Sequence, residues 1–182
     1  MSNYEQLVND PRVMDFDRPV LLRGLNIGGI NNQEMIKLVK GLGVKIDGFT
    51  RYFLESLDFK TLDNKQTQNM IKVRLNNIGL KGDALSYPKI RKHAKICGFK
   101  ECPKETPFEL FLNEIETISN EPIFVATQPV YNSDKIPFIF RVDFVDKSVV
   151  LTNSSTMGGT GWVENDEFLF MLPKEMVREV VA

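Results

Sequence analysis

The chain has 182 residues, 42% of them apolar, and its 23 lysines and arginines almost balance its 24 aspartates and glutamates. This length and apolar content suffice for one sizeable core but scarcely for two, so we expect a single domain over residues 1–182. The balanced charge provides no field that would draw the chain onto DNA or an anionic membrane, so charge gives no support to a nucleic-acid partner. No apolar run approaches the roughly 20 residues that span a bilayer, and we expect no membrane partner.

The cysteine and histidine content limits the chemistry available to the chain. Cys97 and Cys102 are too few for a disulfide framework, and the first residues lack the basic and apolar regions of a signal peptide. We therefore expect a protein of the reducing cytoplasm. His93 and the two cysteines are one ligand short of a structural zinc site, so we predict no metal. A nucleophilic triad would depend on this one histidine alone, which makes that class of enzyme a poor fit.

The first predicted elements are a strand and a helix. An apolar run over residues 19–29 predicts a buried strand that ends at two adjacent glycines, which permit a turn with positive φ. Apolar residues then repeat at helical spacing from Met35 to Leu42. Asn31 and Glu34 resemble a capping box at the start of this repeat, so the pattern predicts a short amphipathic helix.

Three further helices are predicted before residue 120. A weaker helical pattern covers residues 63–78, and another begins at Ser86. The clearest pattern begins at Thr106 as N-cap, with a proline directly after it and Glu109 at the third helical position. Apolar residues continue at helical spacing from there to Ile118.

Beyond Asn120 the apolar period changes from helical spacing to alternation, most clearly over residues 136–145. The other strand-like runs are residues 123–127, 148–152, 167–172 and 176–181. Short strands with brief connections favour antiparallel pairing. We therefore predict an α+β fold with helices mainly in the first two-thirds and an antiparallel sheet mainly from the last third. The glycine-rich segment 152–162 predicts a loop of the kind that often carries function.

Arg23 and Glu167 stand in patterns that together are similar to a known family. Arg23 is followed by Gly24 on the early apolar strand, and Glu167 opens a hydrophobic strand that leads to a proline-containing turn. This order resembles the mono-ADP-ribosyltransferases, which have an arginine on an early strand, a Ser-Thr-Ser motif in the middle and a late glutamate. The middle motif is reduced to Thr127 in FVATQ. An alternative at 154–156 (Ser-Ser-Thr) matches better but leaves too little room before Glu167 for the intervening strands.

The resemblance implies a role for each of these four residues. Arg23 would clamp NAD with its fork of donors, and Gly24 would let the backbone approach this cofactor closely. Thr127 would orient Glu167, and Glu167 as the catalytic residue would stabilise the oxocarbenium-like centre while nicotinamide leaves. The reaction is the transfer of ADP-ribose from NAD to an acceptor, and the fold it implies has a split sheet.

The acceptor side of the implied site is less well defined. Asn165 lies where the family often has glutamate or glutamine, and Trp162 precedes Glu167 by five residues, where related toxins place an aromatic residue. These two residues would recognise the acceptor, for which a protein is the first choice. The sequence does not distinguish a transferase from an NAD glycohydrolase, because both need the same cofactor pocket.

Two other hypotheses remain beside the transferase. The segment LLRGLNIGG, followed by a helix that contains a methionine, also resembles the start of the uncharacterised DUF1697 proteins. The alternative function is a phage or bacterial regulator, or effector, that binds and inhibits a host protein through a strand edge and the Trp162 loop. A transferase requires Arg23, Thr127 and Glu167 to converge on one cleft, whereas a binding protein has no reason to bring them together.

Overall fold

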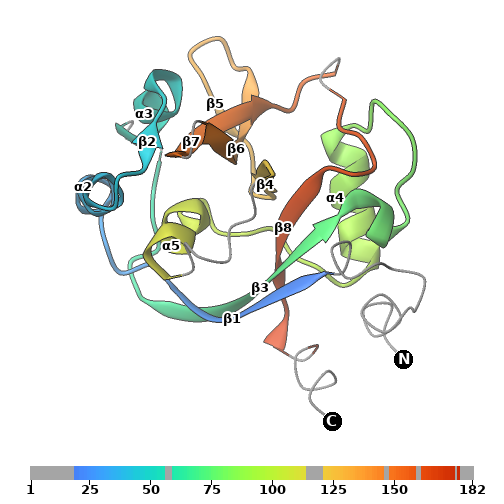
Figure 1. The fold of residues 1–182 in the computed structure, drawn as a ribbon, viewed down its shortest axis with the longest axis horizontal. Helices are drawn as coiled ribbons and strands as arrows, with labels where there is room; N and C mark the ends of the chain where they lie inside the picture. Colours follow the sequence, from blue (N-terminus) through green and yellow to red (C-terminus); the bar gives the residue numbers. More distant parts are fainter. Residues whose placement is uncertain are drawn as a thin grey trace.

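The computed structural model describes residues 19–55, 59–113, 121–145, 148–158, 161–174 and 176, and these form four α-helices and one eight-stranded sheet (Figure 1). The predicted α+β class is confirmed. No helix in these stretches is long and apolar enough to cross a membrane. The elements in chain order are β1 (Val20–Ile27), α2 (Asn32–Gly41), β2 (Lys45–Ile46), α3 (Gly48–Glu55), β3 (Gln66–Arg74), the 3₁₀ helix η2 (Leu75–Ile78), α4 (Tyr87–Ile96), α5 (Thr106–Asn113), β4 (Ile123–Val125), β5 (Val130–Tyr131), β6 (Pro137–Val145), β7 (Ser148–Ser155) and β8 (Glu167–Leu172).

The strands follow the order β1-β3-β8-β4-β6-β7-β2, and β5 pairs with β6 outside this path. Most neighbours are antiparallel, as predicted, but β4 and β8 run parallel and so do β2 and β7. The sheet is not built from the last third alone. Strands β1, β2 and β3 come from the first half of the chain, and β3 pairs directly with β8.

The predicted helix over residues 63–78 is wrong, because residues 66–74 form the strand β3. In β3 the apolar side chains Ile71 and Val73 lie on one face and Met70 on the other, and all three are buried. A strand covered on both faces loses the alternation that marks a half-exposed strand. The short apolar run in β3 is therefore compatible with a helical repeat as well as with a strand.

The other helix predictions are confirmed where the structure describes them. Asn31 caps α2 by accepting a hydrogen bond from the Glu34 N–H at 3.0 Å. Helix α4 begins directly after Ser86, and α5 begins at Thr106. The predicted continuation to Ile118 lies outside the described residues, as do residues 177–181 of the predicted last strand.

Helix α3 was missed, although its start carries a local signal. Asp47 precedes the helix, and its Oδ1 accepts hydrogen bonds from the N–H groups of Phe49 and Thr50 at 2.9 and 3.1 Å. Aspartate is a preferred N-cap residue, and Phe53 and Leu54 are the buried apolar residues that follow. The helix is short, which leaves too few turns for its periodicity to stand out.

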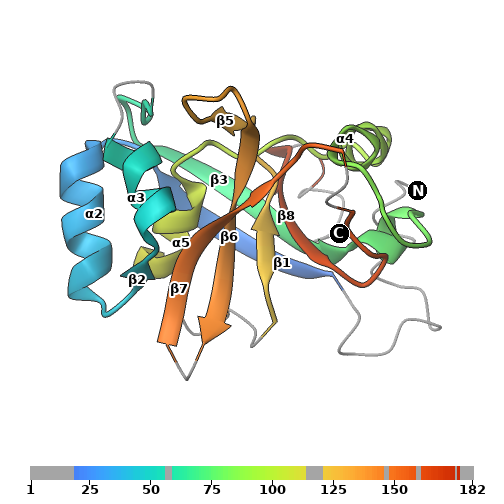
Figure 2. The ribbon, with the colours of Figure 1, turned by 90° about the horizontal axis from the view of Figure 1, so that it is seen from above.

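The sheet has an apolar core on each face. One core lies under α2, α3 and α5, and these three helices gather on one side of the molecule (Figure 2). The other core includes Ile90 and Ala94 of α4 together with Trp162 and Phe168. Helices α2 and α4 lie at opposite ends of the molecule in both views.

Two glycines after β1 allow a close approach between two chain segments. Gly28 has φ +90°, and a Cβ there would lie 2.7 Å from the carbonyl oxygen of Asn64 and 2.8 Å from Cβ of Leu62. The next residue, Gly29, donates its N–H to the carbonyl of Leu62 at 2.9 Å. The turn predicted at these glycines is therefore also the place where β1 and α2 are joined to the segment before β3.

Replacing Gly28 with alanine tests this close contact, and Gly43 provides the matched control. Both glycines have positive φ, but a Cβ at Gly43 would meet no atom within 4 Å. We expect Gly28→Ala to lower the free energy of unfolding by about 1–3 kcal/mol more than Gly43→Ala, because it adds a steric clash to the same backbone strain. Urea unfolding measures the difference, and equal losses would contradict the close contact.

Candidate functional site

Arg23 and Gly24 lie at a β-bulge in the edge strand β1. The pairing register with β3 shifts between Leu22 and Leu25, and Gly24 adopts φ +69°. The Gly24 N–H donates to the Asn69 side chain at 3.1 Å, and both Arg23 and Gly24 are exposed. Three of the eight residues of β1 are exposed and three are buried, which corrects the prediction of a buried strand. A bulge with an exposed charge also protects an edge strand against pairing with another chain.

Thr127 is fully buried just after β4. Its carbonyl oxygen accepts a hydrogen bond from the Tyr87 hydroxyl at 2.6 Å, and its N–H donates to the Val125 carbonyl at 2.8 Å. Its hydroxyl oxygen has no hydrogen-bond partner in the described part of the chain. Burial raises the pKa of the Tyr87 hydroxyl, which therefore stays protonated and serves as a donor. Thr127 thus connects the end of β4 to α4.

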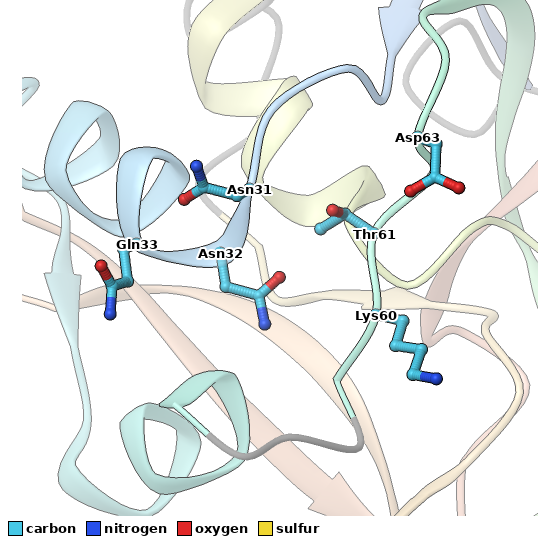
Figure 3. A pocket seen from close by; sticks show the side chains of 6 residues that line it. All are labelled: Asn31, Asn32, Gln33, Lys60, Thr61 and Asp63. Atoms are coloured by element: carbon cyan, nitrogen blue, oxygen red, sulfur yellow. The ribbon is translucent and has the colours of Figure 1, made fainter.

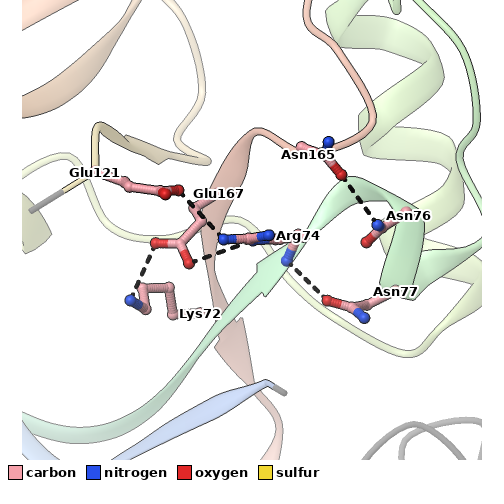
Figure 4. Close-up of polar contacts among 7 residues, drawn as sticks. All are labelled: Lys72, Arg74, Asn76, Asn77, Glu121, Asn165 and Glu167. Atoms are coloured by element: carbon pink, nitrogen blue, oxygen red, sulfur yellow. Dashed lines mark hydrogen bonds and ion pairs between the residues drawn. The ribbon is translucent and has the colours of Figure 1, made fainter. Parts of the chain in front are cut away.

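Glu167 opens β8 and is paired with two cations from β3. Its Oε2 lies 3.0 Å from Nζ of Lys72, and its Oε1 lies 3.9 Å from Nε of Arg74 (Figure 4). The side chains of Lys72 and Glu167 are only 9% and 10% exposed. Arg74 also contacts the exposed Glu121 at 3.4 Å. A carboxylate this deeply buried needs such partners, because an unpaired charge in the interior is costly.

The structure does not bring the three key residues of the resemblance together. Gly24 bonds to Asn69, which pairs with Leu172 at the far end of β8 from Glu167. Leu172 lies five positions along β8 from Glu167, which is about 17 Å at roughly 3.3 Å per residue. Arg23 is near this far end and two strands away, on β1. Thr127 is also displaced, because Ile123 is the β4 residue paired with Glu167. The pockets found in the described part of the chain are lined by none of the three.

Trp162 is buried. It is 4% exposed and packs against Tyr87, Phe124 and Phe168, with ring centroids 5.7–5.8 Å apart. Its backbone pairs with Leu85 in an isolated bridge. The predicted role as an exposed aromatic residue is therefore wrong in this structure, and Trp162 forms part of the core under α4.

Asn165 and the alternative serine motif are also placed by the fold. Asn165 is exposed, and its Oδ1 accepts a hydrogen bond from Nδ2 of Asn76 at 3.2 Å (Figure 4). The neighbouring Asp166 is partly buried, and this burial raises the pKa of its carboxyl group. Ser154 and Ser155 belong to β7 and pair with β6, three places along the sheet from β8. They are not close to Glu167 either.

A large cleft lies beside α4. Its volume is about 880 Å³, and one wall is an exposed stripe of α4 at helical spacing, formed by Pro88, Arg91, Lys92 and Lys95. The α4 cleft, as we call it, is lined by these four residues and by Leu62, Ala94, Phe99, Lys100, Glu101, Cys102, Pro103, Gln128, Phe170 and Met171. Sequence reasoning missed it, although residues 84–100 contain five lysines and arginines and no acidic residue.

The charges around the α4 cleft are unbalanced. Arg91 forms a two-pronged pair with Glu101, with Nε 2.6 Å from Oε1 and the second prong at 3.0 Å. Among the described residues, no carboxylate lies within ion-pair distance of Lys92, Lys95 or Lys100. The cleft therefore joins an apolar interior to a rim with an excess of positive charge.

A smaller polar pocket of about 510 Å³ lies where α2 begins (Figure 3). Three of its six residues already hold the fold together. The Asn32 amide donates to the carbonyls of Leu54 and Phe59, the Thr61 hydroxyl donates to the carbonyl of Ile30, and Asn31 caps α2. Because these groups join α2 to the neighbouring segments, we assign the pocket a structural role.

Comparisons with known proteins do not identify the chain: no family model matches it, and neither curated proteins nor solved structures give a significant match. The resemblances to the mono-ADP-ribosyltransferases and to the DUF1697 proteins therefore stay predictions.

The buried pair of Lys72 and Glu167 can be tested against the exposed pair of Arg51 and Glu55 on α3. We expect Glu167→Gln to lower the free energy of unfolding by about 3–5 kcal/mol, because it leaves the Lys72 ammonium buried without its counter-charge. Glu55→Gln breaks an ion pair whose side chains are 52% exposed, and it should cost no more than about 0.5 kcal/mol.

A double variant separates the buried charge from simple loss of packing. Lys72→Met combined with Glu167→Leu removes both charges and keeps apolar volume, so it should recover most of the stability lost in Glu167→Gln. Urea unfolding of all four proteins measures these changes. A double variant as unstable as the single one would show that the pairing of charges is not what stabilises the start of β8.

Proposed function

We propose that this chain is a non-enzymatic regulator that acts by binding another protein, and that the α4 cleft is its binding surface. The observation that carries this proposal is the excess positive charge on the rim of an apolar cleft. Lysines that lie side by side on one helix face repel one another, and this repulsion does not stabilise the fold. The arrangement therefore indicates a role in binding. A partner that supplies the opposite charge would remove that repulsion.

The cleft has the size and the chemistry of a recognition site. A volume of about 880 Å³ lies in the range of ligand and peptide pockets. The stripe formed by Arg91, Lys92 and Lys95 is presented by a regular helix, so these side chains have a fixed spacing. The remaining exposed apolar residue of α4, Ile96, is 64% exposed and extends the apolar surface of this helix.

Two features favour binding over ADP-ribosyl transfer. Glu167 is held by Lys72 at 3.0 Å, and a carboxylate that is already paired has less negative charge to offer to a developing cation. Arg23 stands on the outer edge of the sheet, where its forked donors meet no pocket found in the described part of the chain. The transferase, with NAD and a split sheet, is the second hypothesis and rests on the resemblance alone.

The binding hypothesis is tested by placing a photo-crosslinking amino acid at Lys92, in the α4 cleft, and in parallel at Lys37, an exposed residue of α2 at the opposite end of the molecule. We expect a covalent adduct of defined mass from position 92 in a lysate of the source cell, and none from position 37. Adding Lys95→Glu and Lys100→Glu should abolish the adduct. Equal adducts from both positions, or an adduct unaffected by charge reversal, would refute the cleft as the binding surface.

The transferase hypothesis is tested by measuring nicotinamide release from NAD, with and without that lysate as a source of acceptor. Our proposal predicts no release above background from the wild-type chain, because none of the pockets formed by the described residues brings Arg23, Thr127 and Glu167 together. Arg23→Ala serves as a variant that should leave the fold intact, since its side chain is exposed. Release that disappears in Arg23→Ala would overturn our proposal and establish NAD chemistry.

A further inference from the structure

We propose that the segment captured by the α4 cleft is an acidic stretch of a protein in which carboxylates flank one apolar side chain. This inference rests on the proposed function, because it names the partner of the same cleft. It goes further by assigning the charge, the apolar anchor and the part of the cleft that receives each.

The positive rim selects for carboxylates. Lys92 and Lys95 line the cleft from α4, and Lys100 lines it from the segment after α4 that bridges to Met171 of β8. All three residues are exposed, which leaves their ammonium groups accessible to a ligand. Glu101 does not cancel them, because its carboxylate is already held by both prongs of Arg91. Carboxylates on a bound segment would therefore neutralise the three lysine ammonium groups.

The floor of the cleft selects for an apolar side chain between those carboxylates. Phe99 and Phe170 stack with ring centroids 5.8 Å apart and close the base of this floor together with Ala94 of the same core cluster. The apolar surface that a ligand can reach comes from the half-buried side chains of Leu62 and Met171, which also line the cleft. A leucine or phenylalanine placed there would lose water from apolar area without leaving a buried polar group unpaired.

The same floor disfavours nucleic acid, the other common polyanion. Binding of single strands depends on aromatic faces on which bases stack. Phe99 and Phe170 are 3% and 1% exposed and are already stacked on each other, and they are the two aromatic residues among the described residues that line the cleft. Gln128 is exposed at the cleft and can pair with a peptide group through both its amide donor and its acceptor.

The experiment is a fluorescence-anisotropy titration of the full chain with a labelled synthetic peptide in which glutamates flank a central phenylalanine and leucine. Lys92→Glu combined with Lys95→Glu should weaken binding at least about ten-fold, since each reversal replaces an attraction by a repulsion. The control, Lys37→Glu combined with Lys45→Glu, makes the same charge change on exposed residues of α2 and β2 and should leave binding unchanged. Circular dichroism and thermal unfolding confirm that both variants stay folded.

Three further ligands make the result decisive. Replacing the peptide glutamates by glutamine, or its two apolar residues by alanine, should each weaken binding at least about ten-fold, because each removes one half of the recognition. An oligothymidylate should bind more weakly than the acidic peptide at equal salt. Tighter binding of the oligothymidylate that is lost in the Lys92/Lys95 variant would overturn the proposal in favour of nucleic acid.

The two proposals fail in different ways. If the crosslink from Lys92 forms and depends on charge while the acidic peptide does not bind, the partner class is wrong and the binding function stands. If neither the crosslink nor peptide binding is observed, the α4 cleft is not a binding surface and both proposals fall.

Discussion

The fold depends on strand β8, which joins the early and late halves of the chain into one sheet. It pairs with β3 on one side and with β4 on the other. Through β3 it connects to the edge strand β1, and through β4 it connects to β6, β7 and β2. Both faces of β8 are buried, because Phe168 and Phe170 face the core under α4 while Leu169 faces the core under α2, α3 and α5.

The residues on which the resemblance to a transferase rests also have structural roles in this sheet. The first residue of β8 is close to the interior, so a glutamate there requires counter-charges, and β3 supplies them from Lys72 and Arg74. At the outer edge of the same sheet, Gly24 permits a bulge and Arg23 keeps a charge on the edge. Each residue has a structural role that needs no contribution from the other.

The exposed face of α4 forms one wall of the α4 cleft. Tyr87, Ile90 and Ala94 are the buried residues of this helix, and the exposed stripe with Lys92 and Lys95 lies outside the core. Gly98 adopts φ +83° after the helix, and the chain then returns so that Lys100 pairs with Met171 of β8. The turn thus brings Lys100 to the cleft that α4 lines, and the core side chains of α4 pack in the same cluster as Phe168 and Phe170 of β8.

The sequence by itself determined those elements whose signals are local. Caps and helical spacing identified α2, α4 and α5, and alternation or apolar runs identified β1, β4, β6, β7 and β8, because these signals need only a few neighbouring residues. The tertiary structure alone decided that residues 66–74 become a strand, since their burial on both faces comes from β1 and β8. It also decided where Arg23, Thr127 and Glu167 lie, and that lysines on α4 and after it face one cleft. The order of these residues along the chain determines neither arrangement. The distances between them depend on how strands from remote segments pair.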